Sequence, residues 1–202
     1  MKNLHWKGDR FFLGLTGLPG SGKSAARSIL EKLGCRALDA DALAHEVLDE
    51  PDTMDALKNI FGEEVLEDGK VDRAAIAKRV FGNKDLLQRL NNLVHPRVRE
   101  LARERMNSFP EGSIVVYDVP LLFEAGLEKE MDASLVVDAS FPTRLKRVES
   151  RNWTEEQLRS RDQHHFQDKP DRADFVISNE ETLDELERQL QDLLKNIEAA
   201  KK

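Results

Sequence analysis

The chain has 202 residues, of which 40% are apolar and 34% are charged, a length and composition typical of one globular domain with room for an inserted subdomain. Its 38 acidic residues outnumber the 31 basic ones, which argues against a general nucleic-acid binder. A single cysteine, Cys35, excludes an internal disulfide and favours a reducing compartment. No run approaches the ~20 apolar residues that a membrane span needs. We therefore expect a cytoplasmic protein that binds neither nucleic acid nor membrane; its oligomeric state stays open.

Five short apolar runs predict the strands of a sheet. They are Phe11–Thr16, Cys35–Leu38, Ser113–Val119, Ala133–Asp138 and Asp174–Ser178. Apolar strands separated by helical segments are typical of a parallel sheet that is covered on both faces. Ligands of such sheets bind beyond the carboxyl ends of the strands. The pattern predicts an α/β fold with a five-stranded parallel sheet flanked by helices.

The segment between the second and third strands, Ala42 to Arg105, reads as helical throughout, with no strand-like run. Its predicted interruptions are Pro51, Phe61-Gly62, Asp68-Gly69, Phe81-Gly82 and His95-Pro96. After the fourth strand, residues 144–172 also read as helical, with a break at Gln167–Pro170. We accordingly divide the chain into a core (9–41, 112–143 and 173–199), a helical insertion (42–111) and a second helical segment (144–172).

A glycine-rich segment follows the first strand and precedes a helix. Gly17 to Ser24 reads GLPGSGKS and matches G-x-x-x-x-G-K-[ST]. Gly20 and Gly22 allow the backbone to approach phosphates closely, and the exposed N–H groups bind anionic oxygens. Lys23 supplies positive charge, and Ser24 supplies a hydroxyl for Mg²⁺. The alternative, a turn that only caps a helix, does not require eight matching positions; the segment predicts a P-loop NTPase fold that binds ATP and Mg²⁺.

Two further positions carry carboxylates near strand ends. Asp118 ends the run VVYD and is a candidate Mg²⁺ ligand, the alternative being a cap of the following turn. Asp41 follows the second strand and is a candidate to orient or deprotonate an acceptor hydroxyl. Either Asp39 or Asp41 has the residue type that caps the helix from Ala42, so spacing alone leaves this pair ambiguous.

Residues 144–172 contain eight basic and six acidic side chains, a net charge of +2 in a chain whose total is −7. A mildly cationic helical segment suits a lid that closes over ATP and excludes water. The alternative is a solvated helix with ion pairs such as Glu155 with Arg159. A guanine-specifying N-K-x-D segment is missing, since Leu86 follows Asn83-Lys84-Asp85, which argues against a GTPase.

Six segments occur in an order that resembles dephospho-CoA kinases, over about Phe11 to Leu194. They are GLTGLPGSGKS, LGCRALDADALAHEV, VDRAAIAKRVF, LNNLVHPRV, VVYDVPLLFEAGL and ADFVISN. The resemblance implies transfer of the ATP γ-phosphoryl to the ribose 3′-hydroxyl of dephospho-CoA, the last step of coenzyme A synthesis. It also implies that the insertion binds the acceptor and that residues 144–172 form the lid.

The resemblance further implies individual roles. Asp41 is the expected base, and Lys23 and Arg151 are expected to act on the transferring phosphoryl. The implied ATP-binding residues are Gly20, Ser21, Gly22, Lys23, Ser24 and Ala25. The implied acceptor-binding residues are Asp41, His45, Arg73, His95, Leu121 and Glu124. The loop departs from the usual GGIGSGKST, but Ser24 keeps the metal hydroxyl.

Two rival functions remain from the residues alone. A kinase of nucleoside monophosphates needs arginines that grip the acceptor phosphate, and Arg73, Arg97 or Arg99 are of that type. A nucleotide-dependent switch instead predicts slow hydrolysis without stimulation by an acceptor.

Overall fold

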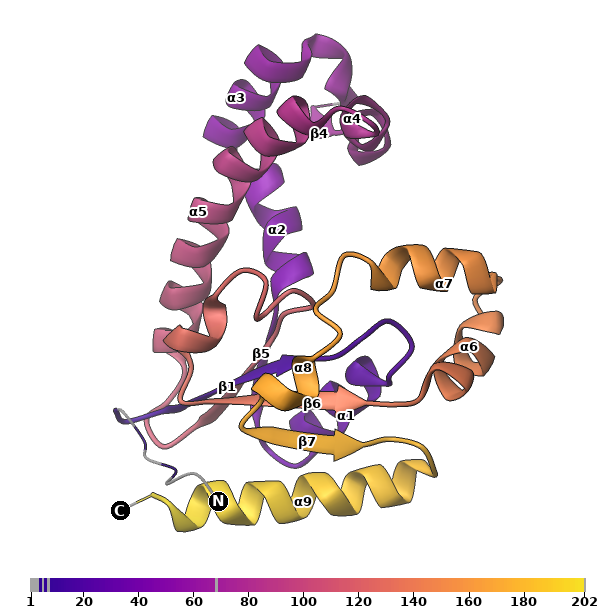
Figure 1. Cartoon of the computed structure of the whole chain (residues 1–202). Helices are drawn as coiled ribbons and strands as arrows, with labels where there is room; N and C mark the ends of the chain where they lie inside the picture. The colour runs from indigo at the N-terminus through magenta and orange to yellow at the C-terminus, as the bar shows by residue number, and fades with distance from the viewer. Residues whose placement is uncertain (1–3, 5, 7, 68, 202) are drawn as a thin grey trace. The chain divides into compact units, whose positions relative to one another are not determined.

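The computed structural model describes residues 4, 6, 8–67 and 69–201, and the chain forms two compact units (Figure 1). The core unit comprises the chain up to Leu38 together with the chain from Phe109 onward. The inserted unit is Asp39–Ser108.

The core unit is built on a five-stranded sheet in the order β2-β5-β1-β6-β7. Its strands are β1 (Phe11–Thr16), β2 (Arg36–Asp39), β5 (Ile114–Asp118), β6 (Ala133–Asp138) and β7 (Phe175–Ser178). In the central strand β1, Leu13 lies opposite Val116 of β5 on one side and Ala133 of β6 on the other, both in parallel register. The predicted α/β fold and parallel sheet are confirmed, with strand boundaries within a residue or two of those expected.

Helices α1 (Lys23–Lys32) and α9 (Leu183–Ala199) share one apolar core with the strands. Alternate residues of β1 face this core, because side chains along a strand point to opposite faces. Phe11, Leu13 and Leu15 are fully buried there. Figure 1 shows α9 running alongside β7, and Leu190 of α9 is fully buried as well.

The other face of β1 is covered by the chain that follows β5. A Cβ added at Gly14 would come within 2.9 Å of Leu122 and 3.0 Å of Met131. The short helix η2 (Leu127–Glu130) lies between these two residues in the chain. Close packing here explains why the centre of β1 carries a glycine.

Residues 141–172 contain three helices separated by turns: α6 (Phe141–Glu149), α7 (Glu155–Asp162) and α8 (Lys169–Arg172). The predicted break at Gln167–Pro170 is misplaced. The chain leaves the helix after Asp162 and re-enters one at Lys169, with Pro170 in its first turn, where proline is tolerated because that N–H needs no partner.

The inserted unit contains four helices within its described residues, α2 (Ala40–Leu48), α3 (Pro51–Phe61), α4 (Arg73–Val80) and α5 (Lys84–Ser108), and a short helix η1 (Glu63–Val65). Its own core is a cluster of Leu57, Phe61, Val65, Val71 and Ile76. A separate hydrophobic core is what allows this segment to form a unit of its own.

The expectation that the insertion has no strands is wrong. Strands β3 (Leu66–Glu67) and β4 (Lys70–Val71) pair in antiparallel register. The chain turns between them at Asp68-Gly69, of which Asp68 lies outside the described residues and Gly69 has φ +76°. An Asp-Gly pair between short strands is a hairpin signal, but two residues per strand leave no apolar run to recognise.

The predicted interruption at His95-Pro96 is also wrong, because α5 runs through Pro96. An internal proline removes one helical hydrogen bond and costs about 3 kcal/mol. Burial of Val94 and Val98 on either side of it offsets that cost at about 1.5 kcal/mol or more per side chain. Arg97 also pairs with Glu50 at 2.9 Å, so packing within the inserted unit overrides the local signal.

Candidate active site

The phosphate loop connects β1 to α1 in a conformation that two glycines permit. Gly20 has φ +83° and Gly22 has φ +97°, in the left-handed region that side chains rarely adopt. Asn179 packs directly against Gly22 and donates a hydrogen bond from Nδ2 to the carbonyl oxygen of Ser21 at 2.8 Å. A Cβ at Gly22 would lie 2.1 Å from that Nδ2 atom. The residue directly after β7 therefore fixes the shape of the loop.

Two basic side chains from the first turns of α1 contact Asp118, the last residue of β5. Lys23 Nζ pairs with Asp118 Oδ1, and Arg27 lies 3.3 Å from Asp118 Oδ2. Asp118 is only 2% exposed, and a carboxylate that is so deeply buried requires paired positive charge. The structure thus brings together the predicted residues Lys23 and Asp118, and it adds Arg27, which no motif singled out.

Helix α6 contacts the loop backbone through two arginines. Arg144 donates from Nη1 to the carbonyl oxygen of Pro19 at 3.0 Å, and Arg147 donates from Nη1 to the carbonyl oxygen of Ser21 at 3.2 Å. Both were counted in the sequence only as part of a cationic segment. Helical spacing places residues three apart on the same face, and the sequence offered no signal for their carbonyl partners.

The segment 144–172 is less available to an anion than its composition indicates. Arg144 is buried against Asp162, and Lys169 is 1% exposed against Glu124. The alternative to a lid was a solvated helix with surface ion pairs, and one such pair is present: Arg159 Nη2 lies 2.7 Å from Glu155 Oε1 on the surface of α7. Arg151, the predicted lid arginine, is exposed in the turn after α6.

Glu124 binds the start of α8 and the chain before it. Its carboxylate accepts hydrogen bonds from Lys169 Nζ at 2.9 Å and from the Phe166 N–H at 2.6 Å. Burial would raise the pKa of Glu124, but these hydrogen bonds outweigh that effect and lower it. Burial lowers the pKa of Lys169, and the bond to Glu124 opposes the change. Glu124 therefore has a structural role here, and its contact with an acceptor stays a prediction, as does that of Leu121, which is 40% exposed.

The aspartate pair at the start of α2 is no longer ambiguous. Asp39 is the N-cap, and its Oδ1 accepts from the N–H groups of Asp41 at 2.9 Å and Ala42 at 3.3 Å. Asp41 contributes only its backbone to this cap, and its side chain is exposed. The carboxylate of Asp41 is therefore not required for capping.

The remaining predicted residues also belong to the inserted unit. His45 lies one helical turn after Asp41 on α2, which places both on one face. Arg73 is the first residue of α4, and its Nη2 atom lies 3.6 Å from Oδ2 of Asp49. His95 lies on α5, where burial, with a contribution from Arg99, lowers its pKa. Their contacts with an acceptor stay predictions.

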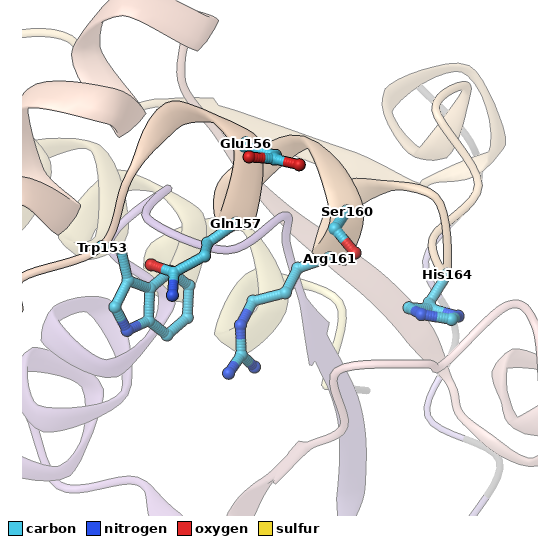
Figure 2. A pocket seen from close by; sticks show the side chains of 6 residues that line it. All are labelled: Trp153, Glu156, Gln157, Ser160, Arg161 and His164. Carbon is cyan, nitrogen blue, oxygen red and sulfur yellow. The ribbon is translucent and has the colours of Figure 1, made fainter. Parts of the chain in front are cut away.

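The surface of α7 carries an open hollow of about 510 Å³, seen in Figure 2. Gln157 and Arg161 project from the same side of α7 in that view, toward Trp153, which precedes the helix. The Arg161 guanidinium lies 4.0 Å from the centre of the Trp153 ring. Such stacking holds a long cationic side chain in place. His164 completes the row at the far end of the helix.

The described part of the chain contains neither a metal-binding cluster nor a membrane-spanning helix. It contains no group of three or more His, Cys, Asp or Glu residues arranged to hold a metal ion. Within residues 8–67 and 69–201, no helix has both the length and the apolar character needed to cross a membrane.

A five-stranded parallel sheet with a phosphate loop between its central strand and the next helix defines the P-loop NTPase fold. A shikimate kinase structure from Bacteroides thetaiotaomicron shares this fold, with a TM-score of 0.54 at 14% identity, over 92% of this chain and 98% of that one.

The sequence profile of the dephospho-CoA kinase family matches residues 11–185, and the chain belongs to this family. It is 42% identical to a dephospho-CoA kinase of Thermobifida fusca, over 92% of this chain and 96% of that protein. A crystal structure from Thermus thermophilus matches with a TM-score of 0.82 at 34% identity, over 93% and 98% of the two chains. A dephospho-CoA kinase from Campylobacter jejuni matches with a TM-score of 0.74 at 25% identity, over 94% and 98%.

Proposed function

We propose that this chain transfers the γ-phosphoryl group of ATP to the ribose 3′-hydroxyl of dephospho-CoA, giving coenzyme A and ADP. The observation that carries this proposal is the family match over residues 11–185, which includes an intact phosphate loop. The reaction belongs to the cytoplasm, in keeping with the single buried free cysteine.

The phosphate loop supplies the nucleotide contacts. Residues Gly20 to Ala25 present backbone N–H groups and the N-terminus of α1 to the β- and γ-phosphates, and Lys23 adds its charge. Ser24 and Asp118 offer a hydroxyl and a carboxylate, the hard oxygen donors that Mg²⁺ prefers alongside phosphate oxygens, so this donor set fits the ion. Bound there, Mg²⁺ would neutralise charge on the transferring group.

The acceptor hydroxyl is assigned to Asp41. Since Asp39 caps α2, the exposed carboxylate of Asp41 is available to orient that hydroxyl or take its proton. Arg151 would add positive charge at the transferring phosphoryl from the lid, residues 144–172. We assign acceptor binding to His45, Arg73 and His95 in the helical insertion 42–111, and to Leu121 and Glu124 in the core unit.

The test measures ADP release with dephospho-CoA and with a panel of nucleoside monophosphates. Stimulation by dephospho-CoA alone supports the proposal, whereas stimulation by a monophosphate would replace it with the rival kinase. Asp41→Asn should lower turnover about 10²- to 10⁴-fold, as for loss of a general base, with ADP affinity kept. Asp39→Asn is the matched control, because asparagine caps a helix as well as aspartate. Near-normal turnover of Asp41→Asn would remove Asp41 from the mechanism.

A further inference from the structure

A buried ion pair joins the two main helices of residues 141–162. Arg144 of α6 donates from Nη1 and Nη2 to the two carboxylate oxygens of Asp162, the last residue of α7, at 2.8 Å each. The side chains are 4% and 12% exposed. A bidentate pair of this kind fixes the relative orientation of its partners as well as their distance.

The same guanidinium reaches the phosphate loop. Arg144 Nη1 also donates to the carbonyl oxygen of Pro19 at 3.0 Å. The backbone of α6 lies against the next residue of the loop, since a Cβ at Gly20 would be 2.9 Å from the Arg144 carbonyl oxygen and 3.0 Å from Val148. One side chain therefore connects the loop, α6 and the end of α7.

The adjoining chain depends on Asp162 as well. Gln167 donates from Nε2 to the backbone oxygen of Asp162 at 2.8 Å, so the segment between α7 and α8 is tied to the same point. By contrast, the pair of Glu155 with Arg159 lies on the exposed face of α7, with side chains 54% and 61% exposed. Exposed ion pairs contribute little to folding stability. Removing one partner of a buried pair is costly, because it leaves an uncompensated charge in the protein interior.

We propose that Arg144 and Asp162 are positioning residues that make the shape of the phosphate loop depend on the placement of α7. This inference rests on the proposed function only in that the loop binds nucleotide. With the pair intact, Arg144 is held at Pro19 and the loop is preorganised for phosphate. With the pair broken, binding must first restore that geometry, so nucleotide affinity falls.

The direction in which ADP affinity changes in two charge-changing variants distinguishes a positioning role from a purely electrostatic one. Asp162→Asn makes the chain more positive by one charge, and Arg144→Gln makes it more negative by one. If these residues acted only through their charge on an anionic ligand, the two variants would shift ADP affinity in opposite directions. Positioning predicts that both weaken ADP binding, by about tenfold or more, the scale of one lost charge-assisted hydrogen bond.

The experiment is calorimetric titration of the full chain with ADP, together with KM values for ATP and dephospho-CoA. We expect the KM for ATP to rise in both variants while the KM for dephospho-CoA stays unchanged. Glu155→Gln is the control, because it removes an exposed acid from the same helix and should leave ADP affinity as in the wild type. Opposite shifts in the two variants, or unchanged ADP affinity with a lower melting temperature, would overturn the proposal.

A double variant covers the case in which the single variants fold poorly. Arg144→Met with Asp162→Leu replaces the pair by apolar side chains, which often restores stability at buried pairs, but Pro19 still lacks its donor. We expect the melting temperature to recover and ADP affinity to stay low; recovery of both would show a purely structural role. Wild-type protein that binds ADP without phosphorylating dephospho-CoA would refute the proposed function alone, whereas wild-type protein that binds no ADP would refute both.

Discussion

Replacing Gly22 by alanine tests whether the loop must keep its observed shape to bind nucleotide. Gly22 has φ +97°, and its Cβ would lie 2.1 Å from Asn179 Nδ2. The left-handed conformation costs about 1–2 kcal/mol for a residue with a Cβ. Displacement of Asn179 loses its hydrogen bond to Ser21, about 0.5–1.5 kcal/mol. The free loop of the variant relaxes, and nucleotide binding must restore the strained conformation.

We therefore expect Gly22→Ala to weaken ADP binding by about 10- to 300-fold, since each 1.4 kcal/mol corresponds to a factor of ten. Calorimetric titration with ADP measures this loss directly. Gly34→Ala is a matched control, because Gly34 has φ +98° but nothing lies within 4 Å of its Cβ position. It should carry similar backbone strain away from the loop, lowering the melting temperature by about 2–8 °C and leaving ADP affinity unchanged. Wild-type affinity in Gly22→Ala, or an equal loss in Gly34→Ala, would refute the reasoning.

Three further predictions concern buried groups. Asp118→Asn should raise the Mg²⁺ concentration needed for half-maximal ADP release by about 10- to 100-fold, and an unchanged Mg²⁺ requirement would argue against a metal role. Burial, with a contribution from Lys169, lowers the pKa of His165 despite the opposing effects of Glu124 and Asp162. Stability should therefore fall as pH drops below the ordinary value of about 6.5, and His165→Asn should flatten this fall in melting temperature between about pH 7 and 5. Because burial raises the pKa of Cys35 to about 11, a thiol reagent at about pH 8 should label it only after unfolding, and rapid labelling of the folded chain would contradict this.

The fold could be predicted from the sequence because its signals are local. A strand buried on both faces shows as an apolar run, and β6 occupies the six residues that its run indicates, Ala133–Asp138. The phosphate loop was predictable for the same reason, since its glycines, Lys23 and Ser24 fall within eight consecutive residues. The two errors in the insertion have different causes. The hairpin was missed because two-residue strands leave no apolar run, and Pro96 was misread because packing overrides the local helix-breaking signal within α5.

The surroundings of the loop could not be predicted in the same way. Asn179 and Ser21 are 158 residues apart, and Arg144 and Pro19 are 125 apart. In each case the acceptor is a backbone carbonyl, which every residue has, so neither partner's type reveals the contact. Asn179 does belong to the segment ADFVISN that supports the family resemblance, but the resemblance alone did not show what its side chain does.

The Asp39-Ala40-Asp41 segment shows how one structural fact can separate two identical side chains. An N-cap must have extended backbone, because its side chain folds back to accept from the N–H groups two and three residues ahead. Asp39 meets this condition with φ −110° and ψ 116°, whereas Asp41 is already in the first turn of α2. Capping is therefore confined to one of the pair by backbone geometry. The other carboxylate makes no capping contact, and this difference is what singles out Asp41 rather than Asp39 for the proposed role at the acceptor hydroxyl.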